Sequence, residues 1–359
     1  MTGGGGDAGA FGVYLHVPFC LRRCDYCAFA TWDDRGHLLD RYVDGLVREV
    51  SASSVPPAST VFFGGGTPSL LSPDQLARVL DAVVRQPGAE VTVECNPDTL
   101  DDGKLAGYRA AGVDRISLGV QSMVGHVLAT LGRTHDPANV HRAVDGIRAA
   151  GFRTWNVDLI YGAVGESLDD WRRTLEEALA LEPPHVSAYG LTVEAGTPLA
   201  LDIARHPDDD DEADKYLLAE EALTAAGLAS YEVSNWARPG HECRHNHLYW
   251  DQGDYRGYGC AAHSHERGRR WWNVRTPERY LDLVERGRPA EAAGELLDPE
   301  ARALEGLQLS LRTSAGVPVD ALDVDGIEDL VERRGGRLVL TLRGRLLANE
   351  VALRLEPAG

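Results

Sequence analysis

Six short apolar runs, each followed by a longer amphipathic stretch, fill the first half of the chain and leave few topologies open. Each run is rich in Val, Ile or aromatic residues and is bounded by Gly, Pro or Asn, which is typical of buried parallel strands. The runs are Val13–Val17, Thr60–Gly64, Glu90–Cys95, Arg115–Val120, Thr154–Tyr161 and His185–Leu191. Successive strand–helix units predict a parallel sheet with right-handed crossovers. We therefore expect an α/β fold built on a partial (β/α)6 TIM-like barrel.

The stretches between these runs carry helix start and stop signals. Ser72, Pro73 and Gln75 are typical of an N-cap with a capping-box partner, and Gly112 and Gly151 stand where helices commonly end. The helices expected from hydrophobic periodicity are Leu39–Val50, Pro73–Arg85, Leu105–Ala111, Val140–Ala150, Leu168–Leu181 and, near the end of the barrel, Glu212–Ala226.

The composition changes after residue 235, where tryptophan, tyrosine and histidine become frequent. Beyond this region we expect helices at Glu300–Leu311, Ile327–Arg334 and Arg345–Leu355, with a strand at Arg337–Leu342. The chain is accordingly divided into a flexible tail (1–10), a barrel (11–235) and a smaller, mainly helical C-terminal domain (236–359).

The charge balance restricts the partners that this protein can bind. The 359 residues carry 36 Lys and Arg against 55 Asp and Glu, a net charge of -19, which disfavours nucleic acid and anionic lipid. No apolar run approaches the roughly 20 residues of a transmembrane helix, and the Gly-rich start lacks the regions of a secretory signal. We expect a cytoplasmic protein.

Three of the six cysteines lie within eight residues, directly after the first expected strand. Cys20, Cys24 and Cys27 have C-x3-C-x2-C spacing, and three thiolates on one loop can bind three irons of a [4Fe–4S] cluster while the fourth iron stays open. Such a loop lies where barrel active sites are built. The alternative is a zinc site completed by His16 or His37, although no second cysteine pair is present.

The cysteine motif resembles the signature of radical S-adenosylmethionine (SAM) proteins, in which the open iron chelates SAM. Further strings resemble the coproporphyrinogen-oxidase-like branch of that superfamily, in the branch's own order. They are Tyr14-Leu-His-Val-Pro-Phe-Cys20, Gly64-Gly-Gly-Thr-Pro68, Glu94-Cys-Asn-Pro97, Gly119-Val-Gln-Ser122 and Asp158-Leu-Ile-Tyr-Gly162. The fold is then a radical SAM barrel.

The resemblance implies roles for individual residues. Gly65, Gly66 and Thr67 contact the amino and methionyl part of SAM, where glycines let the backbone offer its N–H and C=O groups. Tyr14 and Tyr26 line the cofactor, and Glu94 holds the ribose hydroxyls. The positions that line the second SAM site of the oxidase are Gln121, Arg133 and Asp158. Any of these polar side chains at strand ends could instead cap a neighbouring helix.

Two features separate this chain from the oxidase. The oxidase has a fourth cysteine two residues after the third, where this chain has Phe29, and a longer segment before its cluster loop. The string His245-Asn-His-Leu-Tyr249-Trp250 is similar to the HNxxYW motif of HemW-type haem chaperones, which bind haem and pass it to respiratory haem proteins.

Imidazole is a suitable axial ligand for haem iron, and aromatic rings pack on the macrocycle. His245 is therefore the preferred haem ligand, with Tyr249 and Trp250 shaping the pocket, while His247, His263 and His265 are further candidates. Alternatively, His245 satisfies buried backbone groups and the two aromatic residues fill the core.

The function expected from this resemblance is haem binding and delivery by a protein with a SAM-ligated [4Fe–4S] cluster. Oxygen-independent oxidation of coproporphyrinogen III is the alternative. The expected partners are haem and haem-accepting respiratory proteins, with peripheral contact to membrane-bound clients and homodimer formation left open.

Overall fold

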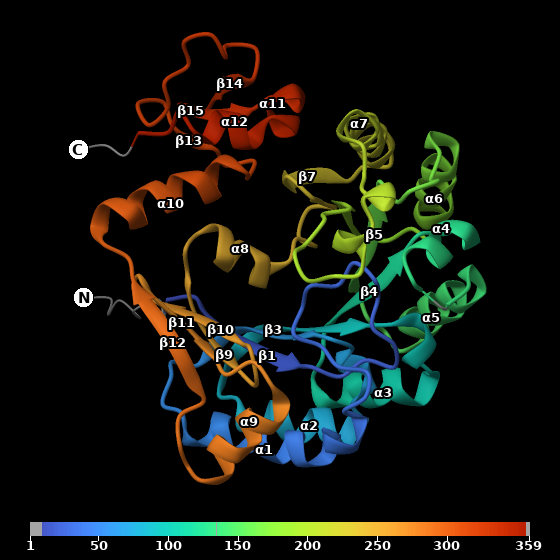
Figure 1. Ribbon diagram of the computed structural model, residues 1–359, viewed down its shortest axis with the longest axis vertical. Coiled ribbons are helices and arrows are strands. Elements are labelled where there is room, and N and C mark those ends of the chain that lie inside the picture. The colour runs from blue at the N-terminus through green and yellow to red at the C-terminus, as the bar shows by residue number, and fades with distance from the viewer. Residues whose placement is uncertain (1–8, 134, 357–359) are drawn as a thin grey trace, which may run out of the picture.

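The structure is a computed structural model that describes residues 9–133 and 135–356. The predicted flexible tail, residues 1–10, therefore lies outside the described residues except for its last two. The described residues form a 12-stranded sheet, in the order β12-β11-β10-β9-β1-β2-β3-β4-β5-β6-β8-β7, and a separate 3-stranded sheet. Figure 1 shows the large sheet curving through the molecule, with helices around its outer side.

The six expected strands form the parallel centre of this sheet, which confirms the barrel prediction. Each pairs in parallel with the next. They are β1 (Phe11–Val17), β2 (Ala58–Gly65), β3 (Arg85–Cys95), β4 (Arg115–Gln121), β5 (Thr154–Tyr161) and β6 (His185–Gly190). Because β1 and β6 are not neighbours in the sheet, the barrel is open, and further strands extend both of its edges.

The helices that follow these strands pack on the outer face of the sheet (Figure 1). They are α1 (Leu39–Ala52), α2 (Pro73–Ala82), α3 (Asp102–Ala111), the short α4 (Gly125–Thr130), α5 (Pro137–Ala149), α6 (Leu168–Ala180) and α7 (Asp209–Ala225). The predicted capping box of α2 is present: Gln75 N–H donates to Ser72 Oγ, and Ser72 N–H donates to Gln75 Oε1. Gly112 ends α3 in the left-handed conformation, as its position predicted.

Alternation along the strands separates the apolar core from the barrel interior. In β4, Ile116 and Leu118 belong to the main apolar core and are fully buried. Arg115, Ser117 and Gln121, at the alternate positions, line a cavity on the other face. The outer face therefore holds the helices, while the inner face presents polar groups.

The sheet extends past residue 235, the predicted end of the barrel. β9 (Asp254–Tyr258) pairs in parallel with β1, and three antiparallel strands follow it: β10 (His263–Glu266), β11 (Arg269–Asn273) and β12 (Glu291–Leu296). At the opposite edge lie β7 (Ala229–Glu232) and β8 (Asn235–Ala237). The predicted boundary at residue 235 therefore does not coincide with the end of the sheet.

The last part of the chain forms a small unit with its own apolar core. It contains α10 (Pro299–Leu311), α11 (Leu342–Leu346), α12 (Ala348–Ala352) and the sheet of β13 (Val317–Pro318), β14 (Val331–Arg334) and β15 (Arg337–Leu340). The helix predicted at Ile327–Arg334 is wrong, because β14 pairs there with β15. None of the helices in the described ranges has the length and hydropathy needed to span a bilayer.

Candidate functional site

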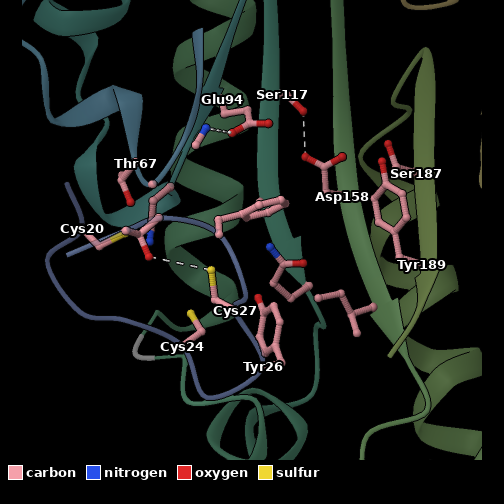
Figure 2. Close-up of a pocket in the computed structure, with 18 of the residues that line it drawn as sticks. Cys20, Cys24, Tyr26, Cys27, Thr67, Glu94, Ser117, Asp158, Ser187 and Tyr189 are labelled. Carbon is pink, nitrogen blue, oxygen red and sulfur yellow. Dashed lines mark hydrogen bonds between the residues drawn. The ribbon is translucent and has the colours of Figure 1, made fainter. Parts of the chain in front are cut away.

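A cavity of about 590 Å³ lies inside the curve of the parallel strands. One end is bordered by the loop that carries Cys20, Cys24 and Cys27, and the other by Cys243 and Asn246. The cysteine loop follows β1, so it lies at the carboxyl ends of the strands, as predicted. Figure 2 shows the three thiols on one side of this space and polar side chains of the strands on the other.

The cysteine loop is closed at its base by backbone hydrogen bonds. Cys20 N–H donates to Trp32 O at 3.0 Å, and Trp32 N–H donates to Pro18 O at 2.8 Å. Burial raises the pKa of the Cys20 thiol to about 11 and also raises that of Cys27. Both thiols are therefore protonated at neutral pH in the metal-free protein, and cluster assembly must release their protons.

The three thiols fit a cluster better than a single ion. Within residues 9–133 and 135–356, no three His, Cys, Asp or Glu side chains are arranged so that all of them could bind the same metal ion. A [4Fe–4S] cluster makes a different demand, because each thiolate binds its own iron. The zinc alternative also lacks its fourth ligand: both ring nitrogens of His16 are engaged, by Tyr14 Oη at 3.1 Å and Ala30 O at 3.0 Å, and His37 is exposed.

The glycine segment after β2 is packed against the cysteine loop. A Cβ at Gly66 would lie 2.6 Å from Phe19 O and 3.0 Å from Cys20 Sγ, so only glycine allows this approach. The N–H groups of Gly65, Gly66 and Thr67 donate to Glu94 Oε2, Val17 O and Phe19 O. These three N–H groups are therefore engaged within the protein, and the predicted contact of this segment with SAM would use its carbonyl oxygens. Carbonyl oxygens are what this backbone can offer, and they suit the ammonium group of SAM.

Two partly buried carboxylates face the cavity, Glu94 from β3 and Asp158 from β5, the two strands that flank β4 (Figure 2). Burial, together with the nearby charge of Asp158, raises the pKa of Glu94 to about 8, although the hydrogen bond from Gly65 N–H opposes the shift. Asp158 accepts a hydrogen bond from Ser117 Oγ at 2.7 Å. Burial raises its pKa too, whereas its hydrogen bonds lower it. Both acids therefore hold their protons more tightly than a carboxyl group in water does.

Gln121 and Arg133 also lie at the cavity, as predicted. A register shift in β4 between Gly119 and Gln121 leaves Gln121 at a φ of 65°, a left-handed conformation that redirects its side chain. Arg133 donates to Gly119 O at 2.8 Å and to Cys24 Sγ at 3.7 Å. Its guanidinium thus supplies positive charge next to a predicted cluster ligand, and its buried Nε has no partner within the described residues.

The two predicted tyrosines differ in their positions. Tyr26 lines the cavity beside Cys24 and Cys27. Tyr14 does not line it, because its ring lies 6.3 Å from that of Phe62 and its hydroxyl contacts His16. Phe62 takes the place at the cavity wall that we expected for Tyr14.

His245 lies in α8 (Arg244–Trp250), in a closed environment outside the cavity lining. Its Nδ1 contacts Thr60 Oγ1 at 2.8 Å and its Nε2 contacts Tyr249 Oη at 2.9 Å. The ring stacks on Phe62 at 5.2 Å, and burial lowers its pKa to about 3. His245 is therefore a neutral, fully hydrogen-bonded imidazole, and iron ligation would require it to give up one of these contacts.

The other histidine and aromatic candidates also lie outside the cavity lining. Trp250 ends α8 and is half-buried, and Tyr249 packs edge-on against Tyr255. The ring nitrogens of His265 contact Gly253 O and Gly268 N. His263 is exposed and stacks on Trp272. Asn246 alone of the HNxxYW motif lines the cavity.

Several polar residues of the cavity wall were not predicted from the sequence. They are Arg115, Ser117, Asn156, His185, Ser187 and Tyr189. They occupy alternate positions of β4, β5 and β6. This period of two was visible in the sequence, and it is the signal that identifies a polar barrel interior.

The comparisons with known proteins agree with this geometry. The sequence profile of the Radical SAM superfamily matches residues 14–178, and its members use SAM and a [4Fe–4S] cluster. A protein of Mycobacterium tuberculosis (strain H37Rv) described as "Heme chaperone HemW" is 44% identical, covering 95% of this chain and 93% of its own length. The protein of that name from Bacillus subtilis (strain 168) is 33% identical, with coverages of 94% and 97%.

Among solved structures, coproporphyrinogen III oxidase (HemN) from Escherichia coli matches with a TM-score of 0.83 at 23% identity, covering 96% of this chain and 89% of the oxidase. That likeness establishes the fold. The identity over nearly the whole length of the curated relatives goes further, and this chain belongs to the HemW family of the radical SAM superfamily.

Proposed function

We propose that this protein is a haem chaperone that binds haem and delivers it to haem-dependent respiratory proteins. The observation that carries the proposal is the 44% identity with a haem chaperone over 95% of this chain. Phe29 supports it, because it stands where the resemblance places the fourth cysteine of the oxidase. It borders the cavity with 68% of its surface exposed.

Different residues of the cavity would bind the two cofactors of the family. Cys20, Cys24 and Cys27 would hold a [4Fe–4S] cluster, and Arg133 would balance its negative charge. The carbonyl groups at Gly65 and Gly66 would accept the ammonium of SAM, and Glu94 would accept its ribose hydroxyls. When bound, the cluster supplies an electron to the SAM sulfonium, which is the radical chemistry of the superfamily.

The oxidase activity remains the second candidate because the cavity contains Gln121, Arg133 and Asp158. By resemblance these residues line the second SAM site of the oxidase. A barrel that keeps these side chains has the polar groups that a radical reaction on a tetrapyrrole would use, although the fourth cysteine is missing.

The partners follow from the proposal. Respiratory haem proteins would receive the haem, and a soluble chain in the cytoplasm would meet membrane-bound clients by peripheral contact. The net charge of -19 disfavours nucleic acid. The proposal extends to a homodimer, which size-exclusion chromatography with light scattering would test, with and without the cluster.

Haem transfer tests the proposed function. The protein is reconstituted anaerobically, loaded with one equivalent of haem and mixed with the apo form of a respiratory cytochrome. We expect transfer to be faster than the spontaneous loss of haem to a passive acceptor such as albumin. Transfer at the spontaneous rate would contradict a delivery function.

A further inference from the structure

The border of the cavity carries two large apolar side chains that the fold does not bury. Leu21 and Phe29 are each 68% exposed, and both lie on the cysteine loop at the cavity. Exposed apolar groups gathered at one site indicate a contact surface. With Arg22 and Arg23 between them, we call this surface the lip, defined as Leu21, Arg22, Arg23 and Phe29.

The two arginines of the lip carry positive charge that no carboxylate of the described residues pairs with. In a chain of net charge -19, neither forms an ion pair with a carboxylate among residues 9–133 and 135–356, whereas the next acid, Asp25, pairs with Arg205 at 3.0 Å. Arg23 donates from one terminal nitrogen to Cys27 O and from its backbone to Asp33, and its buried Nε has no partner in the described chain. Arg22 is exposed. The lip is thus apolar and cationic at once.

The interior of the cavity carries polar groups that a haem macrocycle would have to cover. Its walls carry Glu94, Asp158, Asn156 and Gln121, and an apolar surface pressed against such groups would deprive them of water without replacing their hydrogen bonds. The surroundings of His245 are closed, since both ring nitrogens are engaged and the ring is buried. The lip is the apolar part of the cavity that faces outward.

Haem has the matching chemistry: a flat apolar macrocycle with two propionate carboxylates on one edge. We propose that haem docks on the lip, with the macrocycle against Leu21 and Phe29 and the propionates on Arg22 and Arg23. The inference rests on the proposed function and names the site through which that function acts. The exposed Arg22 can bind a carboxylate in a fork of two hydrogen bonds, which fixes the edge of the ring, and Arg23 adds positive charge beside it.

In this mode of binding, the haem iron takes no ligand from this chain and stays available to the client protein. The segment Cys20–Ala30 contains no histidine, and its cysteines would be occupied by the cluster. The macrocycle is then held by packing and carboxylate contacts, and an axial ligand of the client can take the iron without first displacing one of this chain.

The test is a haem titration of the cluster-loaded protein and four variants. Leu21→Ser combined with Phe29→Ser removes the apolar contact, and Arg22→Glu reverses the charge; each should weaken haem affinity roughly tenfold or more. Leu353→Ser, at a residue 80% exposed in the C-terminal unit, and Arg333→Glu, at another exposed site, are the matched controls and should leave affinity unchanged. Iron content and SAM binding are measured in every sample to show that the cluster loop is intact.

Two further probes identify the contacts. Protoporphyrin without iron should bind with similar affinity, since the proposed contacts do not use the metal. Haem dimethyl ester should bind more weakly to the wild type and show no further loss in Arg22→Glu. His245→Gln should retain haem affinity.

The outcomes separate the two proposals. Unchanged affinity in the lip variants with loss in His245→Gln would overturn the lip and move the site to α8, while the chaperone function would stand. A wild-type protein that binds no haem would contradict the function itself and the lip with it.

Discussion

Asn156 joins a buried cation to a partly buried carboxylate inside the barrel. Its Oδ1 accepts a hydrogen bond from Arg115 at 3.1 Å, and its Nδ2 donates to Asp158 Oδ1 at 2.9 Å. Arg115 is 1% exposed and also donates to His241 O, in the segment before α8. One amide therefore links the predicted SAM-site acid to the far end of the cavity.

Replacing Asn156 with leucine should reveal the cost of breaking this link. Asn156→Leu keeps the volume but removes one hydrogen bond each from Arg115 and Asp158, which retain those to His241 O and Ser117 Oγ. We therefore expect the free energy of unfolding to fall by about 1–3 kcal/mol. Urea unfolding followed by circular dichroism measures it. Asn139→Leu on α5 is the control: the hydrogen bonds of its side chain with Asp98 and Arg142 are exposed to water, which can replace them. It should change stability by no more than about 0.5 kcal/mol. Equal effects of the two substitutions would contradict the role of Asn156.

The contact between Gly66 and Cys20 predicts a defect in cluster assembly. In Gly66→Ala the new methyl group meets Phe19 O at 2.6 Å, so the cysteine loop must move away from β2. We expect iron content per chain and the visible absorption of the cluster to fall severalfold after reconstitution. Gly125→Ala, where a Cβ meets no atom within 4 Å, should load normally. Full loading of Gly66→Ala would show that the loop is adaptable.

Glu94 predicts a pH dependence of stability in the metal-free and ligand-free protein. Burial raises its pKa from 4.5 to about 8, so between these values the folded protein holds a proton that the unfolded chain has lost. The free energy of unfolding contributed by this group is greatest below pH 4.5 and is lost as the pH rises through about 8, by at most about 1.4 kcal/mol per pH unit. The unfolding midpoint of Glu94→Gln should change less with pH over this range than that of the wild type. Identical pH profiles of the two proteins would refute the raised pKa of Glu94.

Sequence periodicity predicted the parallel strands well because they are locally specified. β5 has the predicted bounds, Thr154–Tyr161, and its apolar positions alternate with Asn156 and Asp158. The added strands β9–β12 were not predicted, since Asp254–Tyr258 is a short mixed run whose partner, β1, lies more than 200 residues away. Such pairing depends on tertiary contacts that local patterns do not contain.

In the candidate site, too, some features are specified by the local sequence and others by tertiary contacts. Cys20, Cys24 and Cys27 are close in sequence, so their spacing alone predicted a common site. The closed setting of His245 depends on Thr60 and Phe62 in β2, and no motif within α8 specifies those contacts. A motif predicted the residue but not whether its nitrogens are free.

The buried Lys215 predicts a stability effect away from the cavity. Its ammonium group is inaccessible and donates to Glu166 O at 2.8 Å and to Asp211 Oδ2 at 2.5 Å. Lys215→Ala leaves the buried carboxylate of Glu166 without its cation, and we expect the free energy of unfolding to fall by about 3–5 kcal/mol. In contrast, Arg173→Ala breaks an exposed pair with Glu177 and should cost less than about 1 kcal/mol. Denaturant unfolding of both variants decides the point, and a small loss for Lys215→Ala would mean that water reaches Glu166.

The measurement that tests the central claim most directly joins haem binding and porphyrinogen turnover in one anaerobically reconstituted sample. The account predicts one haem bound per chain and no protoporphyrinogen or 5′-deoxyadenosine when coproporphyrinogen III, SAM and a reductant are supplied. Decarboxylated product together with 5′-deoxyadenosine would contradict it, because the protein would then be an oxidase despite Phe29.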